Sequence, residues 1–263
     1  MINGKTIVLT GANSGIGLEI LKLIVKGDNK ILAVDLHTDK IETFDQNKVI
    51  PMVCDVSTPE NVDSIFDKAT EVLGSIDIFF ANAGFPYYEY MDYISWERID
   101  NIFKVNVYSP IYSLQKYIKY LDGKEGQFGI TISAIGKMAI PGYTLYSASK
   151  FAMNGFQQGM RLELPKNVKL TCVYPIATDT GFFKKAAEGS GKAITERPFP
   201  VQSPKIVAKC TVKGLEKKKK NINPSKLFVF ARFLMAICPP IRTIYWKLEK
   251  KKLVRWAAQK EDK

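Results

Sequence analysis

Three side chains whose types and spacing suit proton transfer lie between Ser133 and Lys150. Tyr146 and Lys150 are four residues apart, so on a helix they share one face and can interact. Ser133 ends an alternating apolar run that predicts a strand, and a turn-rich loop leads from it back to the tyrosine. The pattern predicts that the three side chains meet at one point.

Tyrosine, with a pKa near 10, is a poor acid or base at neutral pH unless its surroundings favour the phenolate. Lowering that pKa by about 2 to 3 units takes roughly 3 to 4 kcal/mol, which one ammonium at ~4 Å supplies at an effective dielectric of ~20. We expect Lys150 to do this for Tyr146, and Ser133 to donate a hydrogen bond to a carbonyl oxygen that becomes negative. These residues alone also fit an ordinary polar pair on a helix surface and a strand-end serine.

A glycine-rich turn near the amino terminus favours the catalytic interpretation. Residues Lys5–Thr10 form an apolar run that predicts a buried parallel strand, and the glycines Gly11, Gly15 and Gly17 follow before an apolar helix. A strand, a glycine turn and a helix together direct backbone N–H groups and the positive end of the helix dipole at a pyrophosphate. Glycines also serve ordinary turns, so the loop gains weight only from its context.

Asp35 ends the second predicted strand, 18 residues after the last loop glycine. A carboxylate at this distance suits the ribose hydroxyls of adenosine, and it repels the 2′-phosphate of NADP. The glycine loop holds no basic residue to offset that repulsion. We therefore predict NAD, with NADP as the less favoured cofactor because His37 and Lys40 lie nearby. The alternative for Asp35 is a solvated acid at a strand end.

Five motifs occur in register along the chain: Thr10–Gly17, Asp55, Asn82-Ala83-Gly84, Asn106, and Ser133 with Tyr146 and Lys150. On these motifs the chain resembles the short-chain dehydrogenase/reductase family over about residues 5–215. The resemblance implies a dinucleotide-dependent oxidoreductase, and it departs from the usual pattern at Ile176, where glycine is frequent, and at Ala81, where asparagine is frequent.

The resemblance implies a catalytic tetrad of Asn106, Ser133, Tyr146 and Lys150. In it, Tyr146 transfers the proton, Ser133 orients the substrate oxygen, Lys150 holds the nicotinamide ribose, and Asn106 supports a proton relay. Cofactor contacts are expected at Gly11, Asn13, Ser14, Gly15, Ile16, Gly17, Asp35, Asp55, Val56, Asn82, Ala83, Gly84, Tyr146, Lys150, Pro175, Thr178 and Thr180.

Strands and helices are predicted to alternate along the chain, which is typical of a doubly wound α/β fold. We expect one Rossmann-type domain with a central parallel sheet over residues 1–222, and a long helix over 95–121 that is broken or bent near Pro110. A segment over about 179–201 is expected to act as a lid on the substrate. By family analogy, the helix of Tyr146 and the helix before it form a homodimer interface, with a tetramer as the alternative.

Length and composition agree with this fold. The 263 residues are 46% hydrophobic, enough for one α/β core, and the first predicted strand leaves no room for a secretory signal. Four dispersed cysteines predict buried free thiols in a reducing, cytoplasmic compartment. His37, the only histidine, follows a strand on the cofactor side, so neither a Ser-His-Asp hydrolase nor a metal site is expected.

Positive charge is concentrated in the last part of the chain. From Lys213 onward, 15 basic residues face four acidic ones, which gives +11 of the overall +12. Residues 227–237 form an apolar run with Arg232 inside it, too short for the ~20 residues of a bilayer span. We expect a helical extension over 223–263 that lies on the inner face of a membrane, and we expect no nucleic-acid binding. The alternative is a helix packed on the protein body or on a neighbouring subunit.

Together these features predict NAD(H)-dependent interconversion of a secondary alcohol and a ketone. The extension indicates a lipophilic substrate, of the steroid, retinoid or fatty-chain kind. One alternative is an NADPH-dependent 3-oxoacyl carrier-protein reductase. Another, of a different class, is a non-catalytic NAD(H)-binding sensor or scaffold.

Overall fold

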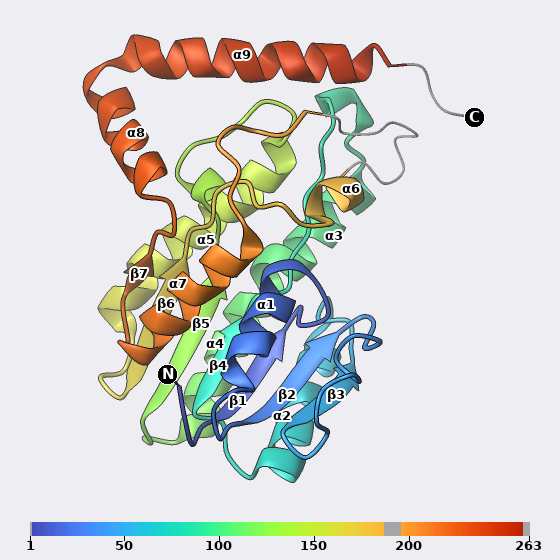
Figure 1. Ribbon diagram of the computed structural model, residues 1–263, viewed down its shortest axis with the longest axis vertical. Helices are drawn as coiled ribbons and strands as arrows, with labels where there is room; N and C mark the ends of the chain where they lie inside the picture. The colour runs from blue at the N-terminus through green and yellow to red at the C-terminus, as the bar shows by residue number, and fades with distance from the viewer. Residues whose placement is uncertain (1, 187–195, 260–263) are drawn as a thin grey trace.

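The computed structural model describes residues 2–186 and 196–259, without the side chains of residues 184 and 185. Seven strands in these ranges form one parallel sheet in the order β3-β2-β1-β4-β5-β6-β7 (Figure 1). The predicted doubly wound Rossmann-type fold is confirmed. The strands are β1 (Thr6–Thr10), β2 (Lys30–Asp35), β3 (Val49–Val53), β4 (Ile78–Ala81), β5 (Gly126–Thr131), β6 (Val168–Val173) and β7 (Asn221–Ile222).

Helices cover both faces of the sheet. On one face, α1 (Gly15–Ile24) packs against α7 (Pro204–Glu216), and both contribute to the same hydrophobic cluster. The opposite face buries side chains of α2 (Pro59–Leu73), α4 (Ser109–Leu121) and α5 (Thr144–Glu163). The apolar strands are therefore buried on both sides, as their near-continuous hydrophobic runs predict.

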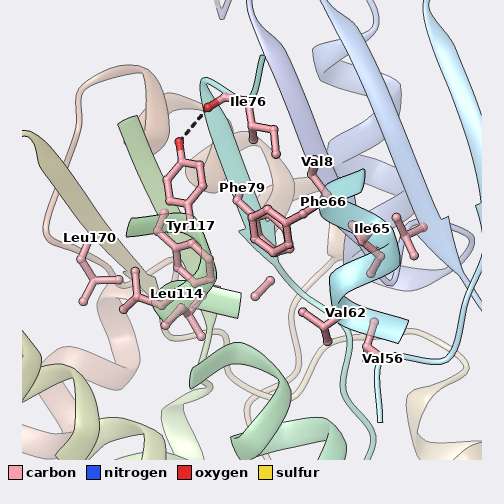
Figure 2. Close-up of a cluster of buried hydrophobic side chains, with 14 of the residues drawn as sticks. Val8, Val56, Val62, Ile65, Phe66, Ile76, Phe79, Leu114, Tyr117 and Leu170 are labelled. Carbon is pink, nitrogen blue, oxygen red and sulfur yellow. Dashed lines mark hydrogen bonds between the residues drawn. The ribbon is translucent and has the colours of Figure 1, made fainter. Parts of the chain in front are cut away.

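Aromatic rings form the centre of the core on the α2 and α4 face (Figure 2). Phe79 stacks between Phe66 and Phe128, with ring centroids 5.1 and 5.2 Å apart. The hydroxyl of the buried Tyr117 donates to the carbonyl oxygen of Ile76 at 3.0 Å, so its polar end is satisfied. Each such apolar side chain contributes roughly 1.5 to 3 kcal/mol on burial, which holds the strands in position under the site.

The predicted helix over 95–121 is divided into two. α3 (Trp96–Phe103) and α4 are separated by a π-helical segment, Lys104–Tyr108. The proline lies in the first turn of α4, where its missing N–H has no cost, so the irregular segment precedes it. Asn106 belongs to this π-helical segment and is 1% exposed.

The expected lid is described only in part. α6 (Phe182–Ala186) follows β6, Thr178 pairs with Gln202 in an isolated bridge, and Arg197 forms an ion pair with Asp179. Residues 187–195 lie outside the described ranges. The lid therefore stays a prediction.

Two helices follow the last strand. α8 (Lys226–Ile237) and α9 (Pro239–Ala257) meet at a sharp bend, and α9 crosses the top of the view in Figure 1. The indole N–H of Trp246 donates to the carbonyl oxygen of Ala139 at 2.8 Å, and Arg255 forms an ion pair with Glu196. No single helix in the described ranges is long and apolar enough to cross a bilayer; α8 and α9 together meet the length and composition requirement, with a bend of 118° between them.

The cysteines differ from the expectation of buried thiols. Cys172 is buried, Cys54 and Cys210 are partly buried, and Cys238 is exposed, all four as free thiols. The prediction is wrong for Cys238 because it lies at the junction of α8 and α9, which pack on the protein body from one side only. In the described residues, no group of three or more His, Cys, Asp or Glu side chains is arranged to hold a metal ion.

Candidate active site and cofactor cleft

Ser133 and Tyr146 meet as the sequence predicts, with the serine hydroxyl near enough to the phenol to lower its pKa. Ser133 lies two residues beyond β5, and Tyr146 lies in the first turn of α5. The serine Oγ also donates to the carbonyl oxygen of Pro175 at 3.3 Å and accepts from the N–H of Ile135 at 3.3 Å. These contacts fix the serine hydroxyl beside the tyrosine.

Lys150 and Asn106 lie on the buried side of this pair. The lysine Nζ donates to the carbonyl oxygen of Thr131 at 3.2 Å. The asparagine side chain donates to Phe85 O at 2.9 Å and accepts from Phe85 N at 3.1 Å. A Cβ placed on Gly84 would lie 2.8 Å from Asn106 Oδ1 and 3.4 Å from Lys150 Nζ, so only glycine fits where these side chains converge.

The electrostatics of the site correct one expectation. Burial raises the pKa of Tyr146 well above its usual value, and the hydrogen bond with Ser133 lowers it only in part. Burial also lowers the pKa of Lys150 to about 8. Desolvation is therefore the largest influence on the pKa of both groups, and for Tyr146 it acts against the expected lowering.

The residues of the glycine loop fit a dinucleotide. Gly11 and Gly15 have φ values of +66° and +54°, a conformation that favours glycine. A Cβ on Gly17 would overlap the carbonyl oxygen of Gly11, so the helix can pack this closely only with glycine there. Asp35 accepts hydrogen bonds from the N–H groups of Asn13 and Leu36, both at 2.8 Å, which orients its carboxylate at the end of β2.

One cavity of about 770 Å³ joins the two halves of the site. It reaches from the glycine loop, past Ser133 and Tyr146, to α8. The predicted cofactor residues that line it are Gly11, Ser14, Gly15, Ile16, Asp35, Asp55, Val56, Asn82, Ala83, Gly84, Tyr146, Pro175, Thr178 and Thr180.

Four predicted site residues lie behind this wall: Asn13, Gly17, Asn106 and Lys150. The side chain of Asn13 donates to Asp39 at 2.6 Å and accepts from the N–H of Lys40 at 2.9 Å. It holds the segment after β2 instead of facing the cavity. The π-helical Asn106 is likewise engaged by backbone groups, so in the chain alone it supports the site from behind.

Sequence reasoning missed most of the apolar wall. Ile176, which replaces the usual glycine, has no positive φ and packs against a cluster that contains Ala134, Met138 and Phe228. Phe228, Ala231 and Met235 share one face of α8 and form part of this wall, but the helix is apolar on nearly all sides, so their spacing does not single out that face. The lining residues without a prior assignment include Phe85, Tyr87, Met138, Ile140, Tyr143, Leu227, Phe228, Met235 and Tyr245.

Comparison with known proteins agrees with this geometry. A family model described as short chain dehydrogenase matches residues 5–191. The chain belongs to this family. It is therefore an oxidoreductase that acts on CH–OH groups with a nicotinamide dinucleotide.

Short chain dehydrogenases of several kinds are similar to the chain. It is 28% identical over 232 residues to the 3-dehydrosphinganine reductase of Danio rerio, which covers 81% of this chain and 70% of the relative. It is 25% identical over 258 residues to the 11-beta-hydroxysteroid dehydrogenase 1A of Arabidopsis thaliana, with 90% and 73% covered. A short chain dehydrogenase/reductase from Burkholderia phymatum in complex with NAD has the same fold, with a TM-score of 0.75 and 20% identity over 95% of this chain and 97% of that one.

Proposed function

We propose that this protein interconverts a lipophilic secondary alcohol and the corresponding ketone with NAD(H). The observation that carries the proposal is the composition of one continuous cavity. It holds the side chains of Ser133 and Tyr146 between the Asp35 carboxylate at one end and the apolar side of α8 at the other.

The side chains divide the chemistry between them. The bound dinucleotide supplies or accepts the hydride. Tyr146 gives a proton to the ketone oxygen, or takes one from the alcohol, while Ser133 donates a hydrogen bond to the same oxygen. Lys150, from behind the cavity wall, stabilises the phenolate when protonated, and Asn106 positions the backbone at Phe85 and supports the proton relay.

The choice of NAD rests on Asp35. Its carboxylate is fixed by two backbone N–H groups and lines the cavity, where it can accept hydrogen bonds from ribose hydroxyls. A 2′-phosphate at that point would meet a like charge. His37 and Lys40 are both exposed, and neither lines the cavity among the described residues.

The apolar wall supports a lipophilic substrate. Aromatic and aliphatic side chains dominate the cavity beyond Tyr146, including Phe182, Phe199, Phe228 and Met235. The names of the similar proteins from Danio rerio and Arabidopsis thaliana point to sphingoid and steroid substrates, which share a large apolar body. Burial of such a body contributes about 25 cal/mol for each Å² removed from water.

Membrane contact through α8 and α9 is the second part of the proposal. The inner side of α8 lines the cavity, and its outer side leaves Phe230, Phe233 and Ile237 between 59% and 64% exposed. On α9, Ile244 and Leu248 are 59% and 53% exposed beside lysine residues. A peripheral position on an anionic inner leaflet would cover these side chains. The alternative, a helix packed on the protein body, applies to part of α9, because Leu253 and Trp256 are buried against the body.

A homodimer through α4 and α5 is the third part. Gly155 and Gly159 are one helical turn apart on α5, and a Cβ on either would meet nothing within 4 Å. Phe151, one turn earlier, is 44% exposed. This open strip of small residues suits close packing of a second copy.

The test of the proposed activity is the variant Tyr146→Phe. It keeps the ring and its packing but removes the proton donor, so we expect turnover of hydrophobic ketones to fall by at least about 10²-fold, in line with general acid catalysis. NADH binding, followed by cofactor fluorescence, is expected to change little. Substantial residual turnover would refute the role of Tyr146, and a wild-type chain that binds NADH but turns over no ketone would favour the sensor alternative.

A further inference from the structure

The cavity carries little charge, and that charge is unevenly placed. Among the described residues that line it, only Asp35, Asp55 and Arg232 are charged. Both acids belong to the cofactor half, since Asp35 ends β2 and Asp55 lies two residues beyond β3. The substrate half therefore has a single charged lining residue, the guanidinium of Arg232 on α8.

The helix places Arg232 on the face that forms the cavity wall. Phe228 lies four residues before it and Met235 three residues after it, and both line the cavity together with Ala231. Arg232 is exposed, so it stands where the cavity opens to solvent. No carboxylate of the described residues forms an ion pair with it.

A second cation lies near enough to Arg232 to feel its charge, but it is not part of the cavity wall. Lys137, four residues after Ser133, is half-buried, with its Nζ 3.4 Å from the centroid of the Tyr174 ring and 3.4 Å from Asn223 Oδ1. Burial, and after it the positive charge of Arg232, lowers the pKa of Lys137 to about 8. Lys137 adds to the positive potential around Arg232, which favours an anion at the guanidinium.

We propose that Arg232 forms an anion subsite at the α8 end of the cavity, and that the substrate is a long-chain carbonyl compound with a carboxylate or phosphate group remote from its carbonyl. The carbonyl part of this inference rests on the proposed function; the subsite itself does not. The same guanidinium disfavours a protonated amine, so a free sphingoid base is a poor occupant of this cavity.

The test compares two fluorescent probes that differ only in charge, without lipid present. The full chain is titrated with 11-(dansylamino)undecanoic acid and with its methyl ester. We expect the acid to bind about tenfold more tightly, as a charge-assisted hydrogen bond provides. Displacement of the acid probe is expected to be stronger with stearate than with sphinganine.

Variants assign the preference to the subsite. Arg232→Gln is expected to remove most of the preference for the acid probe and to leave the affinity for the ester unchanged. Arg232→Lys is expected to keep part of the preference for the acid. Arg242→Gln is the matched control, because Arg242 lies over the ring of Trp246 on α9 and does not line the cavity. Lys137→Gln is expected to weaken the acid to a smaller extent.

Several results would overturn the proposal. They are equal affinity for acid and ester in the wild type, no binding of either probe, or an equal loss in Arg232→Gln and Arg242→Gln. If Arg232→Gln weakens binding to anionic vesicles but keeps the preference for the acid probe, Arg232 contacts a lipid surface instead of a substrate anion. If the preference holds but no ketone is reduced with NADH, the subsite stands and the proposed activity falls.

Discussion

Ser133 holds a backbone conformation that non-glycine residues rarely adopt, with φ at 115°. Such a conformation costs of order 1 to 3 kcal/mol and persists where surrounding contacts enforce it. Here the contacts are those of its side chain with Pro175 and Ile135, beside the phenol of Tyr146. These contacts hold the serine Oγ toward the place where a substrate oxygen would lie, so little reorganisation is needed during the reaction.

The pH dependence of the reaction should report Lys150. Its pKa of about 8 means that the ammonium is present below that pH and is lost as pH rises. We expect kcat/KM for reduction of an uncharged ketone to fall as pH rises through about 8, because the charge that stabilises the phenolate disappears.

Two variants separate Lys150 from Lys137, whose pKa is also about 8. Lys150→Arg keeps its charge throughout this range and should lose the decline, even if its rate is lower. Lys137→Gln should still show the decline in kcat/KM as pH rises through about 8. A wild-type profile that stays level to pH 10 would contradict the assignment.

Cofactor choice is a second prediction at the scale of one residue. In a fluorescence titration, the wild type should bind NADH more tightly than NADPH, because Asp35 accepts from ribose hydroxyls and repels a phosphate. Asp35→Ser should weaken NADH by about tenfold and bring the two affinities closer. A wild type that prefers NADPH would place the carrier-protein reductase reading first.

At the scale of elements, the sequence predicts most of the sheet and little of the cavity wall. The strand that ends in Asp35 is found at its predicted bounds, because a short apolar run between turn residues leaves few alternatives. The π-helical turn around Asn106 has no such signal, since a continuous helical pattern runs through it. The inner side of α8 was hidden for another reason: the helix is apolar on nearly all sides, so its pattern does not tell which side faces the cavity.

Removal of α8 and α9 tests their part in membrane contact. We expect the full chain to float with anionic liposomes, and we expect a chain truncated after Pro224 not to float. Each lysine near the anionic membrane surface contributes about 1 kcal/mol to binding. Binding should weaken in high salt and on neutral liposomes.

A second variant guards against general unfolding of the truncated chain. Phe230→Glu combined with Phe233→Glu alters only side chains that are 59% and 61% exposed, and it should also abolish flotation. If the full chain itself fails to bind anionic liposomes, the membrane proposal is wrong.

At the scale of the whole molecule, the two faces of the sheet have different surroundings. α1 and α7 close one face against each other, whereas α5 presents its open glycine strip on the other. The resemblance predicts an interface on this helix but gives no measure of the openness of the strip, which depends on how α4 and α5 sit together.

A charged side chain in that strip tests the homodimer. Gly155→Arg is expected to convert the dimer to a monomer in sedimentation, because it places a long cation where two helices would meet. Ile206→Arg, on the exposed side of α7, is the matched control and should leave the mass unchanged. A wild type that sediments as a monomer, or a Gly155→Arg chain that remains dimeric, would remove this interface from the proposal.

The division of labour between the sheet and α8 has a consequence for how this protein can evolve. The proton-transfer groups stand on β5 and α5, above the aromatic core around Phe79, while α8 contributes to the outer wall of the cavity and pairs with no strand. Substitutions on the inner side of α8 alter which molecules fit without touching that core. Substitutions in this one helix can therefore change which substrates bind, while the domain that carries the catalytic residues keeps its folding stability.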